Sequence, residues 1–92
     1  MRPERTLALK DECLMWREIE GEVIVLDKRT WTYMGINGSG AVLFKEIAQR
    51  TTVGGLVRRL TEDFGISERV AQHDSEAFVA MLESHELLSE HG

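Results

Sequence analysis

The chain has 92 residues, of which 11 are Lys or Arg and 16 are Asp or Glu, and its formal net charge at pH 7 is −5. A chain of this length builds one domain with a single modest hydrophobic core. Basic residues that neutralise phosphates supply most non-specific affinity for nucleic acids. The acidic balance therefore argues against DNA or RNA as the main partner.

Cysteine usage and the hydropathy pattern indicate the compartment. The single cysteine, Cys13, excludes an internal disulfide and suits a reducing environment. No apolar run approaches the length that crosses a bilayer, and the opening segment MRPERTLALKDE lacks the apolar region of a signal peptide. We therefore expect a cytoplasmic protein that has no membrane partner.

The first third of the chain predicts β-strands. Residues 13–20 combine apolar and aromatic side chains with partial alternation, and an EGE turn follows. Residues 22–27 are β-branched and nearly all apolar, which predicts the central strand of a sheet. Residues 28–30 form a tight turn before a third strand at 31–36, and residues 5–9 favour a further short edge strand.

The remainder predicts three helices. Asn37 and Ser39 are both plausible N-caps of a helix over residues 40–49, in which the core candidates are Ala41, Val42, Leu43, Phe44 and Ile47. Thr51 or Thr52 begins a second helix that ends at Gly65, with core candidates Leu56, Val57, Leu60 and Phe64. Ser67 caps a third helix over residues 68–86. Strands followed by helices predict an α+β fold with a winged-helix-like arrangement.

The motifs that could carry enzyme chemistry are weak. The run GINGSG lacks the Gly-Lys-Ser/Thr ending of a phosphate-binding loop, so a turn followed by a helix cap explains it better. His73, His85 and His91 have no cysteine partners and no metal-site spacing, which predicts surface or cap roles. No nucleophile–base pair or carboxylate pair emerges. We therefore expect a protein without catalytic residues, metal or cofactor.

The third helix carries two stripes at helical spacing. The first would bury the helix against its neighbours and consists of Ala71, Ser75, Phe78 and Leu82. The second is a further apolar row that contains one acid and consists of Val70, Asp74, Ala77 and Met81. Two interpretations stay open at this point. The second stripe is either a broad core face in which a backbone donor satisfies Asp74, or the wall of a groove.

The strand at residues 31–36 supplies the other wall of such a groove. Period-two alternation places Thr32, Met34 and Ile36 on one face, and Trp31 and Tyr33 on the opposite face. If this strand lies at the sheet edge, its unpaired backbone groups form an adhesion site that the protein must hide or use. Neither proline nor an inward-pointing charge protects it, which indicates that the edge is used.

The ordered motifs of the chain resemble the PqqD-like family, whose members are small leader-peptide-binding domains of ribosomally made, modified peptides and are also called RiPP recognition elements. The most specific pieces are Leu26-Asp27, the run of Ile36, Asn37 and Gly40, and the run of Asp74, Phe78 and Leu82. Glu86-Leu87-Leu88 stands where many members have Gly-Leu-Leu. The resemblance covers about residues 13–88, which we expect to be the core of a single domain spanning residues 1–92.

The resemblance implies three strands packed on three helices, with a precursor leader added as a strand to the edge of the third strand, beside the third helix. It is closest to the discrete leader-binding proteins of lasso-peptide clusters, which implies a separate leader peptidase and a cyclase as partners. A PqqD-type chaperone for a radical enzyme is the alternative. The implied peptide-binding residues are Trp31, Thr32, Tyr33, Met34, Gly35, Ile36, Arg69, Val70, His73, Asp74, Ala77, Phe78 and Met81.

A winged-helix DNA-binding protein is the alternative from another functional class. It would need basic residues on the third helix to contact phosphates. Over residues 68–85 the only Lys or Arg is Arg69, against the acids Glu68, Asp74, Glu76 and Glu83. The charge of this helix therefore favours a peptide partner over DNA.

Overall fold

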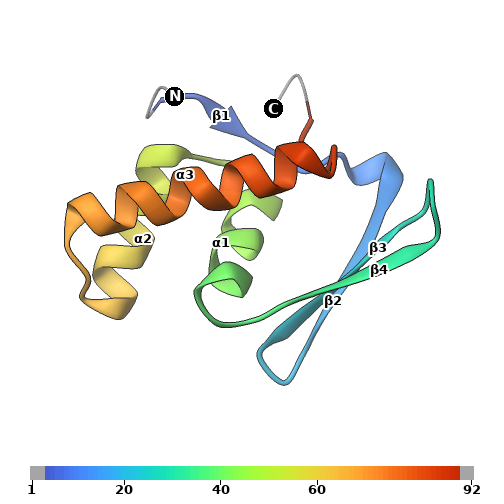
Figure 1. Ribbon diagram of the computed structural model, residues 1–92, viewed down its shortest axis with the longest axis horizontal. Helices are drawn as coiled ribbons and strands as arrows, with labels where there is room; N and C mark the ends of the chain where they lie inside the picture. The colour runs from blue at the N-terminus through green and yellow to red at the C-terminus, as the bar shows by residue number, and fades with distance from the viewer. Residues whose placement is uncertain (1–3, 90–92) are drawn as a thin grey trace.

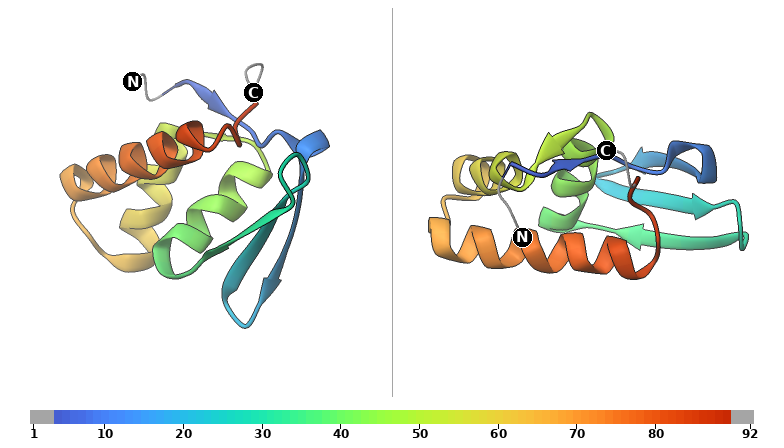
Figure 2. Two further views of the ribbon diagram at one scale, coloured as in Figure 1. Left: turned by 45° about the vertical axis from the view of Figure 1, so that its right-hand side comes forward. Right: turned by 90° about the horizontal axis from the view of Figure 1, so that it is seen from above.

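The computed structural model of the protein describes residues 4–89. A sheet stands beside helix α1, helix α2 lies on the far side of α1, and α3 runs along both helices (Figures 1 and 2). None of the helices within the described residues is long and apolar enough to cross a membrane. In chain order the elements are β1 (Thr6–Leu7), a 3-10 turn (Asp11–Cys13), β2 (Leu14–Ile19), β3 (Glu22–Asp27), β4 (Thr32–Ile36), α1 (Gly38–Ala48), β5 (Thr51–Thr52), α2 (Val53–Phe64) and α3 (Glu68–Ser84).

The main sheet is antiparallel in the order β2-β3-β4, so the β-branched strand β3 is central, as predicted. Ile19 pairs with Glu22 across a two-residue turn in which Glu20 and Gly21 have φ values of 52° and 83°. Two consecutive positive φ values are typical of the type I′ turn, whose twist matches that of the flanking strands. β3 in turn pairs with β4, from Val23 opposite Ile36 to Asp27 opposite Thr32.

Local capping signals set the ends of the second and third helices. The hydroxyl of Thr52 accepts a hydrogen bond of 3.0 Å from the backbone N–H of Gly55, and the hydroxyl of Ser67 accepts one of 3.2 Å from that of Val70. Gly65 ends α2 in the left-handed conformation at φ 66°. Of the two predicted caps of α1, Asn37 occupies the N-cap position, although its side chain makes no capping hydrogen bond.

The core lies between the inner face of the sheet and the three helices. Val23 and Val25 on β3 are buried, and so are Phe44 and Ile47 on α1. The remaining helices contribute the buried side chains Leu56, Val57, Leu60, Ala71, Val79 and Leu82. The α+β prediction of a three-stranded antiparallel sheet followed by three helices is confirmed.

Several local predictions need correction. Trp31 lies in the β3–β4 turn with φ 57°, not in the strand, because its N–H closes the turn onto the carbonyl of Asp27 at 2.7 Å. The segment at 5–9 forms strand β1, but it pairs with β5 in a separate two-stranded sheet. Phe64, proposed for the core, is 47% exposed. His91 lies outside the described residues.

The core stripe of α3 also differs from the prediction. Ala71, Ser75 and Leu82 are fully buried, but Phe78 is only half-buried, and Val79 occupies the buried position beside it. The buried residues thus follow the spacing 71, 75, 79 and 82, and the Phe78 ring lies instead beside Gly40 of α1. The second stripe is not a broad core face, since Val70, Asp74 and Ala77 are exposed.

Candidate functional site

Strand β4 is an edge strand, as predicted. It pairs only with β3, so alternate N–H and C=O groups on its other side have no strand partner within residues 4–89. Ile36 is buried and Met34 half-buried on the inner face, whereas Tyr33 projects outward with 74% of its surface exposed. The backbone of this edge is therefore available to pair with another extended chain.

A groove lies between β4 and the end of α3, and we call it the β4–α3 groove. Its deeper part is a hollow of about 210 Å³ lined by Val25, Asp27, Thr32, Tyr33, Met34, His85 and Leu87. A neighbouring hollow of about 460 Å³ is lined by Asp27, Arg29, Thr30, Thr32, His85 and Glu86. The deeper hollow has an apolar floor and a polar rim, which is the composition of a site that holds an apolar side chain in a fixed orientation.

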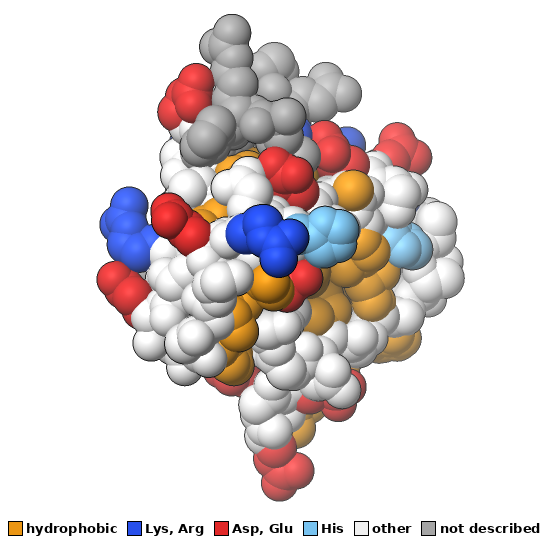
Figure 3. Space-filling model, turned by 60° about the vertical axis from the view of Figure 1, so that its left-hand side comes forward, with side chains coloured by type: hydrophobic (Ala, Val, Ile, Leu, Met, Phe, Trp, Pro, Cys, Tyr) orange, Lys and Arg blue, Asp and Glu red, His pale blue; other side chains and the backbone are white. Residues whose placement is uncertain are grey.

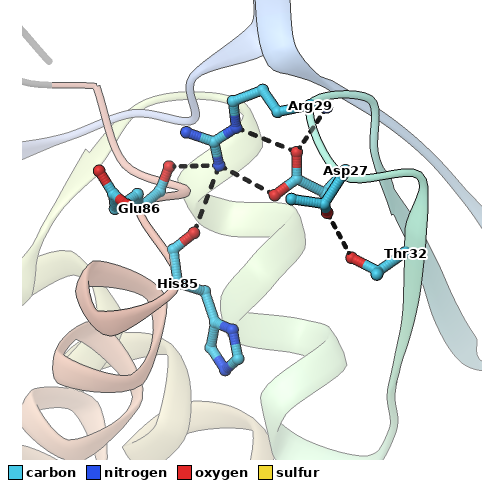
Figure 4. A network of polar contacts seen from close by, with 6 residues as sticks. Asp27, Arg29, Thr32, His85 and Glu86 are labelled. Atoms are coloured by element: carbon cyan, nitrogen blue, oxygen red, sulfur yellow. Dashed lines mark hydrogen bonds and ion pairs between the residues drawn. The ribbon is translucent and has the colours of Figure 1, made fainter.

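Arg29 joins the two walls of this groove at the hairpin end (Figure 4). Its Nε and Nη2 donate to the two carboxylate oxygens of Asp27, each at 3.0 Å. The same Nη2 also donates to the carbonyl of Glu86 at 2.9 Å and to that of His85 at 3.3 Å. The β3–β4 turn is thereby attached to the segment that follows α3, and this attachment sets the distance between the walls.

The electrostatics of this junction follow from the same contacts. The hydrogen bonds from the Arg29 side chain and backbone hold the pKa of Asp27 below its ordinary value. Asp27 in turn raises the pKa of the Arg29 guanidinium through its hydrogen bond. Both groups are therefore charged at neutral pH, when the bidentate pair is at its strongest.

Gly40 sets the opposite end of the site. A Cβ at this position would lie 2.9 Å from Cγ2 of Ile36 and 3.3 Å from Cε1 of Phe78. The missing side chain lets α1 approach the end of β4 and the ring on α3 together. This close packing explains why the run Ile36-Asn37-Gly40 and Phe78 occur together in the motif.

The structure brings three predicted site residues to the margin of one core. Met34, Phe78 and Met81 are partly buried hydrophobic residues packed against the core cluster, one from the edge strand and two from α3. Figure 3 shows hydrophobic side chains gathered beside two histidines on one face of the molecule. These three side chains thus come from two separate elements, β4 and α3.

Other predicted site residues have different positions. Tyr33 and Gly35 lie at positions whose side chains point to the outer face of the sheet. Only their backbone groups therefore face the open edge of β4. Ile36 is 7% exposed, which leaves its backbone as the accessible part. The exposed residues of α3 that carry the remaining predictions are Arg69, Val70, His73, Asp74 and Ala77. Of these, Arg69 and Val70 lie in its first turn, at the end away from the sheet (Figure 1).

The sequence analysis missed most of the residues that line the β4–α3 groove, which are Val25, Asp27, Arg29, Thr30, His85, Glu86 and Leu87. Arg29 and Glu86 are 57 positions apart, so nothing local indicates their contact. The Leu26-Asp27 motif was the one available signal, because an acid directly after an apolar strand marks a polar group at the sheet end.

The PqqD family model, described as "Coenzyme PQQ synthesis protein D", matches residues 22–88. The solved structure "TbiB1 in Complex with the TbiA(beta) Leader Peptide" has a TM-score of 0.84 and 20% identity, over 90% of this chain and 95% of that chain. "Lasso peptide synthetase B1 complexed with the leader peptide" has a TM-score of 0.80 and 17% identity, over 90% of this chain and 96% of that chain. A comparison with curated proteins gave no match.

These likenesses show that the fold is shared with both solved structures. The family match begins at β3 and runs through Leu88, so it contains the edge strand, all three helices and both walls of the β4–α3 groove. Because it spans well over half of the chain, this protein belongs to the PqqD family.

Proposed function

We propose that this chain binds the leader segment of a ribosomally made precursor peptide and presents it to a separate leader peptidase and cyclase in lasso-peptide biosynthesis. The observation that carries this proposal is the uncharged open edge of β4 beside the apolar β4–α3 groove. The two solved structures that share the fold are both complexes with leader peptides, which supports a peptide as the ligand of this fold.

The leader adds to β4 as a fourth strand. Main-chain hydrogen bonds to Thr32–Ile36 supply affinity that tolerates sequence variation, and alternate leader side chains enter the groove and give selectivity. A disordered leader loses conformational entropy when it binds, so apolar anchors must offset that cost. Met34 and Met81 suit this role, because the flexible thioether adapts to the shape of its partner.

The thirteen candidate residues divide by role under this proposal. Thr32, Gly35 and Ile36 act through their backbone, and Met34, Phe78 and Met81 through apolar contact. Asp74 or Arg69 contacts a polar leader group from the exposed stripe of α3. Leader residues paired with β4 lie beside Tyr33, and leader residues beyond the paired strand contact the remaining candidates, which are Trp31, Val70, His73 and Ala77.

The chain acts as an adaptor that has no chemistry of its own. It raises the effective concentration of the precursor at the partner enzyme, so its effect is a faster reaction of that enzyme. This role needs neither a metal nor a cofactor, and no group of three potential metal ligands occurs within residues 4–89. Peptide synthesis on ribosomes places the precursor in the cytoplasm, where we expect this single leader-binding domain to work.

The family description supports a second candidate, a chaperone that delivers a precursor to a radical enzyme of cofactor biosynthesis. Both candidates bind a leader at the same site. The identity of the precursor that binds therefore distinguishes them. DNA binding is disfavoured, because Arg69 is the only Lys or Arg on α3 and lies on the same helix as the exposed acids Glu68, Asp74 and Glu83.

A titration with labelled leader tests the proposal. The leader of the precursor encoded beside the gene for this chain should raise fluorescence polarisation and saturate, whereas a scrambled leader of equal composition should not. A gel shift with random duplex DNA at low salt should show no complex. Binding of the duplex without binding of the leader would replace the peptide function with a nucleic-acid one.

A further inference from the structure

The second surface of interest is the face of the sheet that points away from the helices. The strand registers place Met15, Leu26 and Tyr33 in one row across the sheet, and Arg17, Ile24 and Gly35 in the next row. We call this surface the outer sheet face, and its outward positions are Met15, Arg17, Ile19, Glu22, Ile24, Leu26, Tyr33 and Gly35.

This face is mainly apolar, with Arg17 and Glu22 as its charged positions, and nothing within residues 4–89 covers it. Met15 is 58% exposed, Ile19 49% and Tyr33 74%, and a hollow of about 360 Å³ lies between these side chains and Ile24 and Leu26. Antiparallel sheets that are covered on one side normally place polar residues on the open side. A contiguous exposed apolar surface of this kind marks an interaction site.

A leader bound to β4 would extend the outer sheet face without covering it. Side chains of an added strand alternate between the two faces, so every second leader residue would lie beside Tyr33 and Gly35. Met15 and Ile19 lie two strands away, on β2, and remain exposed. Another molecule is therefore needed to cover them.

A second copy of this chain does not fit the face. Two strands of six residues and one of five, side by side, give roughly 300 Å² per copy, whereas a stable interface needs about 800 Å² per partner. Each copy also carries a net charge of −5, which opposes association. The geometry favours a weak contact with a different protein.

The charges beside the face indicate the chemistry of that protein. The β2–β3 turn projects away from the helices (Figure 1) and carries the exposed acids Glu18, Glu20 and Glu22. Glu18 pairs with Lys45, but Glu20 and Glu22 have no ion-pair partner among residues 4–89. A partner with an apolar patch bordered by Lys or Arg would complement both features.

We propose that the outer sheet face docks the enzyme that processes the bound precursor, through an apolar patch with a basic border on that enzyme. This inference rests on the proposed leader-binding function. Docking is weak for the free adaptor and stronger when leader is bound, because the added strand widens the face that the enzyme contacts. The leader groove and the enzyme surface thus lie on different sides of one sheet.

Charge substitutions on β2 test the proposal with the leader peptidase encoded beside the precursor. Ile19→Glu and Met15→Glu should leave leader affinity within about twofold, yet lower the rate of leader removal about tenfold or more at limiting adaptor, because a charge replaces a central apolar contact. Phe64→Glu is the matched control, since Phe64 is 47% exposed on α2, away from both surfaces. It should leave both measurements unchanged.

Each outcome decides a separate point. An unchanged cleavage rate in both β2 variants, with circular dichroism confirming their fold, would overturn the docking site. Failure of the unaltered chain to bind leader would overturn the proposed function instead. Glu20→Lys should slow association with the peptidase at low salt and have no effect at high salt. An effect that does not depend on salt would contradict the proposal that Lys or Arg residues border the enzyme's patch. A dimer in sedimentation equilibrium that Ile19→Glu dissociates would assign the face to a second copy.

Discussion

The two edges of the three-stranded sheet, β2 and β4, are built differently. β2 carries Arg17 and Glu18 in its middle, and the Glu18 carboxylate pairs with Lys45 of α1 at 2.8 Å. β4 has no charged residue at all, and its edge borders the β4–α3 groove. Charged side chains are a common means of preventing an edge strand from pairing with another chain. One edge of this sheet is thus protected, and the other is left open.

This difference indicates that an open strand edge selects among peptide sequences only when a groove for side chains lies beside it. Backbone groups on β4 would pair with any extended chain. Under the proposed function, the half-buried Met34, Phe78 and Met81 would add a requirement for leader side chains that fit beside them. On β2 the comparable apolar side chains Met15 and Ile19 face the outer sheet face, where a pairing strand would not reach them.

The largest expected effect tests whether β4 is the pairing edge. A leader N-methylated at two positions that donate to β4 should bind about 100-fold more weakly, because it loses two hydrogen bonds of about 1–1.5 kcal/mol each. Methylation at the alternate positions is the control and should have little effect. Added leader should slow hydrogen exchange at the edge-facing backbone amides of Thr32 to Ile36. Protection of Leu14–Ile19 instead would move binding to the β2 edge.

A second comparison uses the same substitution on both edges. Met34→Glu places a charge at the margin of the apolar groove and should weaken leader binding about 30-fold, roughly 2 kcal/mol. Met81→Glu should act in the same direction from α3. Met15→Glu on β2 is the matched control and should leave leader affinity within about twofold. If polarisation titrations showed equal losses of leader affinity for Met34→Glu and Met15→Glu, the added charge would act through long-range repulsion and not by entering a groove.

A third prediction concerns the support of the open edge. Phe78→Ala should lower the free energy of unfolding by about 2 kcal/mol, less than the 3–5 kcal/mol typical of a fully buried Phe, because its ring is half-buried. Phe44→Ala, at a fully buried ring that packs edge-on against Trp16, is the reference and should show the larger loss. Urea unfolding measures both. An unfolding free energy unchanged by Phe78→Ala would mean that this ring does not support the core beside the open edge.

The smallest effect concerns the ion pairs near the two edges. Because Arg29 lowers the pKa of Asp27 in the folded state, the pair adds stability above the ordinary Asp pKa of about 4, and this stability is lost as the pH falls through the lowered value. The melting temperature of the unaltered chain should exceed that of Asp27→Asn at pH 7, and the two should converge as the pH falls below the lowered pKa of Asp27. Glu18→Gln is the control at the β2 edge. It should cost less at pH 7, because it removes one exposed ion pair, whereas Asp27 orients an Arg29 side chain that also donates to two carbonyls after α3.

Local physics made much of the fold predictable. Strand β3 occupies the predicted residues, since a run of β-branched side chains is extended in almost any sheet. Thr52, Gly65 and Ser67 mark the helix ends as predicted, because a capping hydrogen bond or a left-handed glycine involves only residues a few positions apart. The uncharged character of β4 is equally plain from its residue types alone.

Only the tertiary structure decided which of these features meet. The pairing of β1 with β5 and the contact of Arg29 with Glu86 join segments far apart in the chain, and their register has no local signature. Trp31 leaves the strand because closure of the hairpin requires a left-handed residue there, against its own preference. Val79 is buried in the core, whereas the Phe78 ring lies at its margin beside Gly40 of α1, a contact between residues 38 positions apart. Local energies therefore select the elements and their ends, whereas packing over long sequence distances selects the groove.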